Sequence, residues 1–378
     1  MRRWNHCSKC VSAVKVVVRC DASHAIGSGH VMRCLTLAAA LRSRGNEVSF
    51  VCRELPGNLC SFISSRGFAV HVLPTVTLPR ANADGSPHAQ WLEAPRELDA
   101  QQTACIVQRE RPDWLVFDHY ALDARTEAES ARFAKRCMVI DDLADRAHAC
   151  DLLLDQNFYY DAATRYRGLV APACRQLLGP EFALLRPEFA AHRLGRESRM
   201  GHVSRALVFF GAGDVGGGTS LTLEALARLA NRKFSVDVVI GVNCRNRDVI
   251  LNRAAQLPEV QCHEFVDNFA AMMAASDLYI GAAGTTTWER CCIGLPSLVI
   301  AVAKNQEVAI RDLALAGTVR LLGTIGDVTA ATLTEAIRSA VQNPAALALE
   351  SRRAMALVDG LGASRCAAAL HEIIGETT

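Results

Sequence analysis

Short β-branched runs alternate with longer amphipathic stretches along the chain from Val14 onward. This alternation is typical of parallel strands joined by crossover helices, because parallel neighbours need a long connection. The runs expected to form strands in the first half are Val16–Cys20, Val48–Val51, Val70–Leu73, Trp114–Asp118, Met138–Asp141 and Leu152–Asp155. Between them, His30–Arg44 and Glu97–Arg109 carry helical periodicity. One doubly wound domain is expected here.

The pattern is interrupted between residues 186 and 205, a stretch rich in Arg, His, Gly and Ser that opens with an Arg-Pro pair. It then restarts with the expected strands Ala206–Phe210, Val236–Ile240, Val260–Phe265, Leu278–Ile280 and Ser297–Val302. Pro344–Ile374 is expected to form two Ala-rich helices. We predict an α/β fold of two doubly wound parallel-sheet domains facing across a cleft. The predicted division is an extension at 1–13, a first domain at 14–190, a linker at 191–204 and a second domain at 205–378.

Composition excludes several classes of protein. The 378 residues include 41 basic and 39 acidic side chains, so the net charge of +2 offers no bulk field for nucleic acid or an anionic membrane. No apolar stretch reaches the roughly 20 residues that span a bilayer, and Met1–Lys15 lacks the apolar core of a signal peptide. We expect a cytoplasmic monomer that binds neither nucleic acid nor membrane, and any anionic ligand must be held by local groups.

The fifteen cysteines are spread along the chain, and several sit in apolar runs: Cys105, Cys137, Cys291 and Cys292. Buried free thiols are therefore expected. Cys7 and Cys10 have zinc-ligand spacing, but no second pair follows nearby, so no metal site is expected. The polar stretch Thr75–Pro95 is expected to be a loop.

Glycines and polar residues directly follow the first strand. The residues there that we expect to contact a ligand are Arg19, Asp21, Gly27, Gly29, His30 and Arg33. The order of strand, glycine turn and helix is typical of ligand sites in open α/β sheets, although the spacing matches neither a dinucleotide fingerprint nor a P-loop. A histidine at a helix N-terminus is kept neutral by the helix dipole and can accept a proton from water. Alternatively, His30 only caps the helix and Asp21 only pins the loop.

The ends of two further strands carry polar residues to the same edge of the first sheet. Asp118, His119 and Tyr120 end one strand, and they could touch a ligand or stabilise the following turn. Asp141 and Asp142 follow the next strand, where capping a helix or bracing a loop is the favoured interpretation.

The second domain has glycine-rich turns of its own. Gly211 and Gly213 lie in a run after its first strand, which is weak evidence for a phosphate or sugar site on its own. The stronger segment surrounds a helix start and contains Gly284, Thr285, Thr286 and Glu289. Its backbone and hydroxyl donors suit phosphate oxygens, and Glu289 either accepts hydrogen bonds from a ribose diol or complements the helix dipole. Asn305 and Gln306 follow the next long strand, facing the cleft or capping the helix.

Together these residues resemble the UDP-2,4-diacetamido-2,4,6-trideoxy-β-L-altropyranose hydrolases of pseudaminic acid biosynthesis. The motifs that carry the resemblance, between Lys15 and Val319, are Arg19-x-Asp21, Gly27-x-Gly29-His30 with Arg33, Asp118-His119-Tyr120, Glu289 and Lys304-Asn305-Gln306. The resemblance implies the two-domain glycosyltransferase-B architecture, with a second domain similar to that of the UDP-N-acetylglucosamine transferase of peptidoglycan synthesis. It also implies a UDP-sugar substrate, attack of water at C1, release of UDP with inversion, and no metal or cofactor. The route implied is cytoplasmic and serves flagellin glycosylation.

The resemblance also suggests roles for single residues. His30 matches the general base, Tyr120 and Asn305 match residues that line the active site, and the UDP cradle matches Gly284, Thr285, Thr286 and Glu289. The basic N-terminal tail and the Thr75–Pro95 stretch look like additions to the family pattern. Two alternatives stay open: a UDP-sugar-dependent glycosyltransferase with an acceptor pocket, and a nonenzymatic nucleotide-sugar-binding subunit.

Overall fold

The computed structural model describes the following residues: 13–76, 88–195, 199–229, 232–241, 243–264, 266, 268–284 and 286–375. Of the predicted features, residues 1–12 of the extension with Cys7 and Cys10, residues 77–87 of the predicted loop, Phe265 and Thr285 lie outside this description, as do the side chains of Lys304 and Asn305. The chain divides into two compact units. Unit 1 comprises Met1–Leu154, Gly168–Gln176 and Cys366–Thr378, and unit 2 comprises Asp155–Arg167 and Leu177–Arg365.

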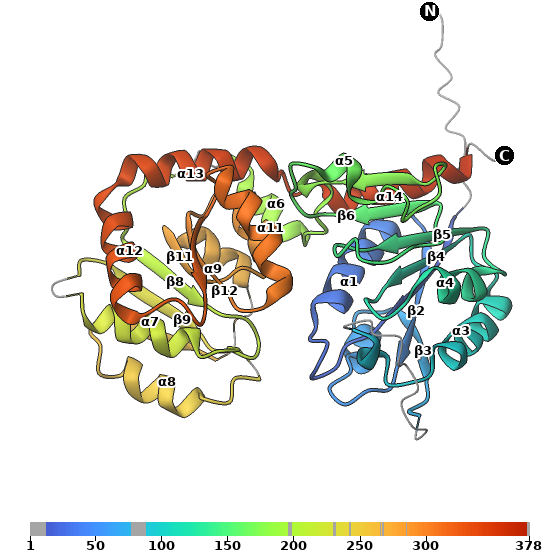
Figure 1. Ribbon diagram of the computed structural model, residues 1–378, viewed down its shortest axis with the longest axis horizontal. Coiled ribbons are helices and arrows are strands. Elements are labelled where there is room, and N and C mark those ends of the chain that lie inside the picture. Colours follow the sequence, from blue (N-terminus) through green and yellow to red (C-terminus); the bar gives the residue numbers. More distant parts are fainter. Residues whose placement is uncertain are drawn as a thin grey trace, which may run out of the picture. The chain divides into compact units, whose positions relative to one another are not determined.

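The first sheet has seven strands in the order β3-β2-β1-β4-β5-β6-β7. Figure 1 labels β3, β2, β4, β5 and β6 of this sheet. The strands are β1 (Lys15–Cys20), β2 (Glu47–Arg53), β3 (Ala69–Leu73), β4 (Trp114–Asp118), β5 (Arg136–Ile140), β6 (Leu152–Asp155) and β7 (Arg175–Leu178). The helices around this part of the chain are α1 (Gly29–Arg42), α2 (Cys60–Ser65), η1 (Ala89–Leu92), α3 (Arg96–Glu110), α4 (Ala124–Ala131), α5 (Ala162–Arg165), η2 (Pro180–Phe182) and α6 (Pro187–Arg193). All six predicted strands are confirmed, whereas β7 was not predicted because its four residues carry no β-branched run.

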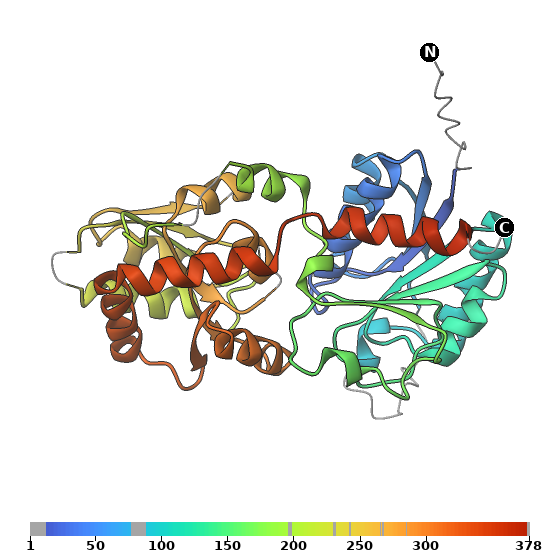
Figure 2. The ribbon, with the colours of Figure 1, turned by 90° about the horizontal axis from the view of Figure 1, so that it is seen from above.

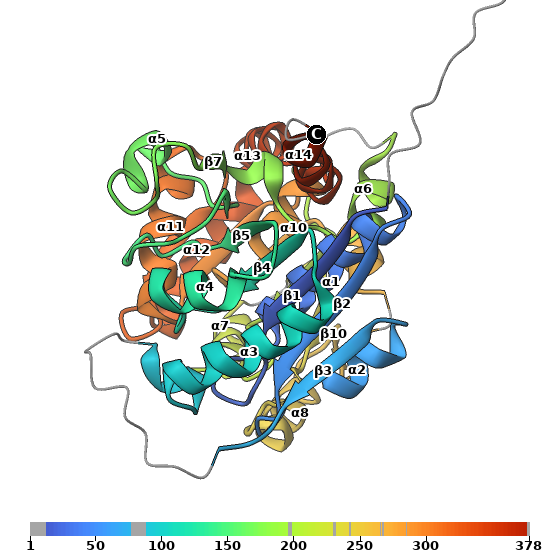
Figure 3. The same ribbon diagram turned by 90° about the vertical axis from the view of Figure 1, so that its right-hand side faces the viewer.

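Alternate residues of the unit 1 strands face opposite layers of helices. Val17 and Leu115 belong to an apolar core that includes Ile106 of α3. Figure 3 shows α3 and α4 on that face of the sheet. On the other face, the Nε1 atom of Trp114 donates to the carbonyl of Leu370 at 3.1 Å, which fixes α14 (Gly362–Gly375) against the sheet (Figure 2).

The second sheet has six strands in the order β10-β9-β8-β11-β12-β13. The strands are β8 (Arg205–Phe209), β9 (Ser235–Val239), β10 (Val260–His263), β11 (Leu278–Ala282), β12 (Ser297–Ala301) and β13 (Arg320–Thr324). The helices are α7 (Gly218–Ala227), α8 (Arg247–Ala254), α9 (Phe269–Ala275), α10 (Thr286–Cys292), α11 (Lys304–Leu315), α12 (Ala330–Gln342) and α13 (Pro344–Leu357). The five predicted strands and the two C-terminal helices are confirmed. The strand β13 was not predicted.

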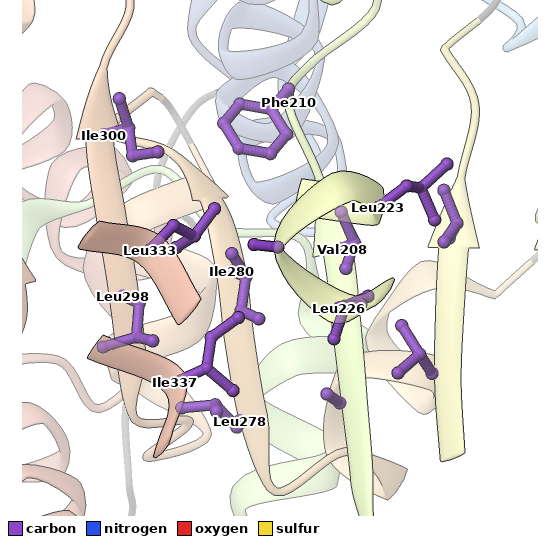
Figure 4. Packing of buried hydrophobic residues seen from close by; sticks show 14 of the residues in the cluster. Val208, Phe210, Leu223, Leu226, Leu278, Ile280, Leu298, Ile300, Leu333 and Ile337 are labelled. Carbon is purple, nitrogen blue, oxygen red and sulfur yellow. The ribbon is translucent and has the colours of Figure 1, made fainter. Parts of the chain in front are cut away.

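Period-two alternation also builds the layers of unit 2. Leu278 and Ile280 of β11 pack with Leu226 of α7 and Ile337 of α12 on one face (Figure 4). Tyr279, between them in sequence, packs instead in a second core that includes α10 and α11. Burial on both faces is what parallel strands require, and it accounts for their nearly continuous apolar sequences.

Both sheets have the same switch in strand order. In the first sheet, β1 lies between β2, the next strand in the sequence, and β4. In the second sheet, β8 likewise lies between β9, the next strand in the sequence, and β11. Every strand pair recorded within these two sheets is parallel. In open α/β sheets, ligands bind outside the carboxyl ends of the strands at such a switch point. The two switch points are therefore the places to look for a site.

The units divide the chain differently from the predicted 14–190 and 205–378. The end of α14 belongs to unit 1, where His371 lies 2.9 Å from Asn46. Part of the predicted linker at 191–204 belongs to unit 2, because the Arg199 guanidinium donates to the carbonyls of Ser276 and Ile293. These contacts join residues far apart in sequence, which local pattern does not reveal. No helix among the described ranges is long and apolar enough to cross a membrane.

Thirteen cysteines lie in the described ranges, and all are free. Cys137, Cys291 and Cys292 are buried as predicted. The prediction is wrong for Cys105, which is exposed. The reason is its place on α3: the neighbouring Ala104 and Ile106 face the core, whereas Cys105 falls on the solvent side of the same turn.

Candidate active site

The switch point of unit 1 brings a histidine, an aspartate and an arginine into direct contact. His30 and Arg33 lie in the first turns of α1, and Asp118 ends β4. The Nδ1 atom of His30 lies 2.5 Å from Oδ1 of Asp118. Arg33 donates to both carboxylate oxygens, from Nη2 at 2.6 Å and from Nε at 2.7 Å. Asp118 is fully buried, and His30 and Arg33 are nearly so.

These contacts set the protonation of Asp118. Burial opposes ionisation, but the charge of Arg33 and the contact with His30 outweigh it and hold the pKa of Asp118 well below its ordinary value. A carboxylate beside Nδ1 requires a proton on that nitrogen, so in the neutral ring the Nε2 atom carries the lone pair. The arrangement is that of a histidine oriented by a carboxylate, which can act as a general base.

A second carboxylate, Asp142, extends this network. Its Oδ2 atom accepts from Nη1 of Arg33 at 2.9 Å, and its Oδ1 atom accepts from the hydroxyl of Tyr120. Burial, followed by the charge of Asp142, raises the pKa of Tyr120 well above its ordinary value. Tyr120 is therefore a hydrogen-bond donor and does not act as a base. Its ring packs edge-on against His30, with centroids 4.6 Å apart.

Three residues here have more contacts with the site than their sequence pattern indicates. Asp142 was expected only to brace a loop or cap a helix, and His88 and Trp91 were included in a polar loop. The structure places Asp142 in the network and both rings against Tyr120. For His88 and Trp91, the sequence feature that could have revealed the contact is the occurrence of two aromatic rings close together in an otherwise polar stretch.

Arg19 and Asp21 lie beneath this network, fully buried. Arg19 donates to both oxygens of Asp21, at 2.7 and 2.9 Å, and also to Asp99. The backbone N–H of Arg53 donates to Asp21 at 2.7 Å, so the carboxylate pins the neighbouring strand. His119 points into the same cluster, with Nε2 3.4 Å from Asp21. Arg19 and Asp21 have no exposed surface with which to contact a ligand. Their contacts instead hold the neighbouring backbone in place, which agrees with the alternative that Asp21 only pins the loop.

The glycine turn between β1 and α1 is held by its own backbone. The N–H of Gly27 donates to the carbonyl of Ser23 at 2.8 Å, and the Ser23 hydroxyl accepts from Ile26 at 3.0 Å. Gly27 has a φ of +80°, a conformation that side chains disfavour. Gly29 begins α1, one residue before His30. The turn therefore fixes where the helix begins and where His30 points.

The switch point of unit 2 carries the predicted glycine turn after β8. Gly211 has a φ of +87°. The turn ends at α7, where the Oδ1 atom of Asp214 accepts from the N–H of Thr219 at 3.1 Å. A Cβ atom on Gly218 would lie 2.2 Å from the ring of Phe210, so only glycine fits there. Gly213 lies between these positions in the same turn.

The β11–α10 turn neighbours it and contains Gly284 and Thr286, the first residue of α10. Glu289, one turn on, is mostly buried, and Nη2 of Arg186 lies 3.4 Å from its Oε1 atom. Burial raises the pKa of Glu289 to about 7, against the opposing charge of Arg186. The Oε1 atom of Gln306 accepts from the N–H of Val302 at 3.1 Å, so this side chain braces the start of α11. Among the residues described, none form a cluster of three or more His, Cys, Asp and Glu suited to a metal ion.

Comparison with known proteins bears directly on this fold. The structure of MurG from Acinetobacter baumannii has a TM-score of 0.66 with this chain, at 12% identity over 95% of this chain and 99% of MurG. The UDP complex of UGT89C1 from Arabidopsis thaliana gives 0.67, at 13% identity over 96% of this chain and 99% of its own. The chain has the glycosyltransferase-B fold.

Sequence similarities agree with that glycosyltransferase-B fold. Residues 219–363 match the glycosyltransferase family 28 C-terminal domain. The chain is 26% identical over 301 residues to the UDP-2,4-diacetamido-2,4,6-trideoxy-β-L-altropyranose hydrolase of Campylobacter jejuni, which covers 78% of this chain and 94% of the relative. It is also 26% identical over 201 residues to the spore coat polysaccharide biosynthesis protein SpsG of Bacillus subtilis, covering 52% and 58% respectively.

Proposed function

We propose that the protein hydrolyses a UDP-2,4-diacetamido-2,4,6-trideoxyhexose at its anomeric carbon and releases UDP and the free sugar. The observation that carries the proposal is the contact of His30 Nδ1 with the buried carboxylate of Asp118. That contact leaves Nε2 as a proton acceptor in a setting where the carboxylate stabilises the imidazolium that forms. The similarity to the Campylobacter jejuni hydrolase supports the substrate class.

In the proposed reaction, a water molecule attacks C1 while Nε2 of His30 accepts its proton. The bond between C1 and the diphosphate oxygen breaks, and UDP leaves with the electron pair. Attack opposite the leaving group inverts the configuration at C1. The imidazolium then returns its proton to solvent, so no covalent intermediate and no metal ion are required.

UDP is proposed to bind at the two glycine turns of unit 2. Gly211, Gly213 and Gly284 let the backbone approach the diphosphate, and Thr286 supplies a donor at the start of α10. Thr285, the preceding residue in the sequence, is proposed as a second donor. Glu289 is proposed to accept from the ribose diol, since a carboxyl with a pKa of about 7 is largely ionised in slightly alkaline solution. Asn305 and Gln306 are proposed to lie beside the sugar, with Gln306 held by its bond to Val302.

The reaction is proposed to take place in the cytoplasm, where the free cysteines of the described ranges stay reduced. Gly27, Gly29 and Arg33 position His30, and Arg19 and Asp21 support the turn from below. Tyr120 is proposed to orient the sugar or the attacking water by accepting a hydrogen bond at its hydroxyl oxygen, because its hydroxyl proton is donated to Asp142.

Hydrolysis in ¹⁸O-labelled water tests the proposal. The protein is incubated with the UDP-diacetamido sugar and no acceptor, and the products are followed by NMR and mass spectrometry. The proposal predicts ¹⁸O at C1 of the sugar, none in UDP, and the inverted anomer as the first product. Label in UDP would indicate attack at phosphorus, and turnover only with an added acceptor would indicate a glycosyltransferase, as the fold also allows.

A further inference from the structure

Four aromatic rings, including that of the candidate base His30, form a contiguous cluster. The short helix η1 carries Trp91, and His88 precedes it. The ring of Trp91 stacks on Tyr120, with centroids 5.6 Å apart and planes at 27°, and it lies edge-on to His30 at 6.4 Å. The His88 ring lies 4.6 Å from Trp91 and 5.2 Å from Tyr120. All four residues belong to unit 1.

The helix η1, which carries Trp91, is fixed to the rest of unit 1 by contacts on its C-terminal side. Leu92, next to Trp91, is fully buried in the apolar core of unit 1. A few residues further on, Nε of Arg96 donates to the carbonyl of Ala121 at 3.0 Å. Ala121 directly follows Tyr120, so the same short stretch of chain that carries Tyr120 also holds the end of the aromatic segment. The position of Trp91 is therefore coupled to that of Tyr120.

The Tyr120 side chain is restrained at three points. Its hydroxyl donates to Asp142, one face stacks on Trp91, and the ring packs at 82° against His30. The imidazole of His30 is in turn fixed by Asp118 at one nitrogen and by the Tyr120 ring at its side. If Trp91 were absent, the Tyr120 ring would lose the surface that stops it from swinging away from His30.

We propose that Trp91 is a positioning residue for the reaction at His30, acting through Tyr120, and that His88 supports it by packing against both the Trp91 and the Tyr120 rings. The kinetic part of this proposal rests on the proposed function. Its physical basis is that stacked and edge-on aromatic pairs have defined geometry, so removal of one ring loosens the next. Small displacements of a catalytic group cost much more in turnover than in binding of a distant part of the substrate.

The test uses Trp91→Leu, which keeps apolar bulk without a ring, and Trp91→Phe, which restores a ring. We expect kcat to fall by on the order of tenfold or more for Trp91→Leu, with the Kd for UDP unchanged, and to recover largely in Trp91→Phe. Phe133→Ala is the matched control, because Phe133 packs partly against the same apolar core but precedes the amino end of β5, whereas the site lies at the carboxyl ends of the strands. It should leave kcat unchanged.

A second readout does not depend on turnover. The ring protons of the histidines are followed by NMR, with His30 and His88 assigned from His30→Gln and His88→Gln. Trp91→Leu should move both resonances, because it removes the ring current of the indole, and should leave His371 on α14 unmoved. Unmoved His30 and His88 resonances, or an unchanged kcat in an active enzyme, overturn the proposal. Shifted resonances in a protein that hydrolyses no UDP-sugar overturn the proposed reaction and leave the ring cluster standing.

Discussion

The Nδ1 atom of His30 lies 2.5 Å from Oδ1 of Asp118, and the same carboxylate receives two hydrogen bonds from Arg33. The positive charge of Arg33 keeps the Asp118 carboxylate ionised, and Asp118 in turn fixes which nitrogen of His30 carries the proton. The pair forms because β1 and β4 are neighbours: the helix that follows β1 starts beside the residue that ends β4. The chemistry of the site thus depends on the strand order of the sheet.

Replacing Asp118 by Asn tests this orienting role. Asn keeps the shape but can present an N–H to Nδ1, which favours the wrong tautomer, so we expect kcat to fall on the order of 10³-fold or more. UDP affinity should be unchanged. Asp113→Asn is the control, because Asp113 precedes the amino end of β4 and contacts Lys15 and Lys135. Equal rates for Asp118→Asn and the wild type would remove Asp118 from the mechanism.

We expect the affinity for UDP to depend on pH because of the titration of Glu289. Its pKa of about 7 means that the carboxylate forms as the pH rises through neutrality. A hydrogen bond to a charged acceptor contributes about 1.5–3 kcal/mol, so the ratio of Kd between Glu289→Gln and wild type should rise from near one at low pH to about tenfold or more at high pH. The ratio cancels the titration of UDP itself.

Glu188→Gln is the control for that titration, since Glu188 pairs with the same Arg186 at 3.0 Å but lies on α6. Isothermal titration calorimetry across pH 5 to 9 measures each Kd. A ratio that stays constant with pH would exclude Glu289 from ribose binding.

We expect the folded protein to lose stability in alkali as His148 loses its proton. It is buried between Glu127, 2.7 Å away, and Asp141, 3.6 Å away; burial opposes its charge, but the two carboxylates raise its pKa to about 9. Because the folded pKa exceeds the unfolded value near 6.5, the stabilisation is complete below that value and is lost as the pH rises through about 9. The loss is about 3 kcal/mol.

Urea unfolding of the wild type and of His148→Gln, at one pH below about 6.5 and one above about 9, measures the loss in the free energy of unfolding. The wild type should lose more stability than the variant between the two pH values. Equal losses would show that His148 is neutral in the folded protein.

Gly218 predicts a steric constraint at the unit 2 site. A Cβ atom there would lie 2.2 Å from the ring of Phe210, so Gly218→Ala should lower the free energy of unfolding by about 1–3 kcal/mol and weaken UDP binding. Gly326→Ala is the control, because the nearest atom to its Cβ would be 3.9 Å away. Thermal unfolding of both variants measures the difference, and equal melting temperatures would contradict the crowding.

The sequence predicted eleven of these strands because each contains β-branched or apolar residues in a run or in strand alternation. The central strands are buried on both faces, which makes their pattern strongest. β7 and β13 lack that pattern: their residues are partly exposed or polar. The sequence placed His30, Arg33, Asp118 and Tyr120 at one edge of the sheet, because each lies at or after the end of β1 or β4, and the structure brings them into contact.

The roles of the other residues around the site depend on contacts between segments that are distant in the sequence. The pairing of Arg19 with Asp99, 80 positions away, turned two expected ligand contacts into buried support. Asp142 gained its role from Tyr120 and Arg33, which only the folded sheet brings together. No local propensity distinguishes such a carboxylate from one that caps a helix.

Single-turnover hydrolysis of the UDP-diacetamido sugar by His30→Ala tests the central claim most directly. With enzyme in excess and UDP binding measured in parallel, we expect the rate of hydrolysis to fall by on the order of 10³-fold or more and the Kd for UDP to be unchanged. A variant that hydrolyses the sugar nucleotide at the wild-type rate would show that His30 is not the base.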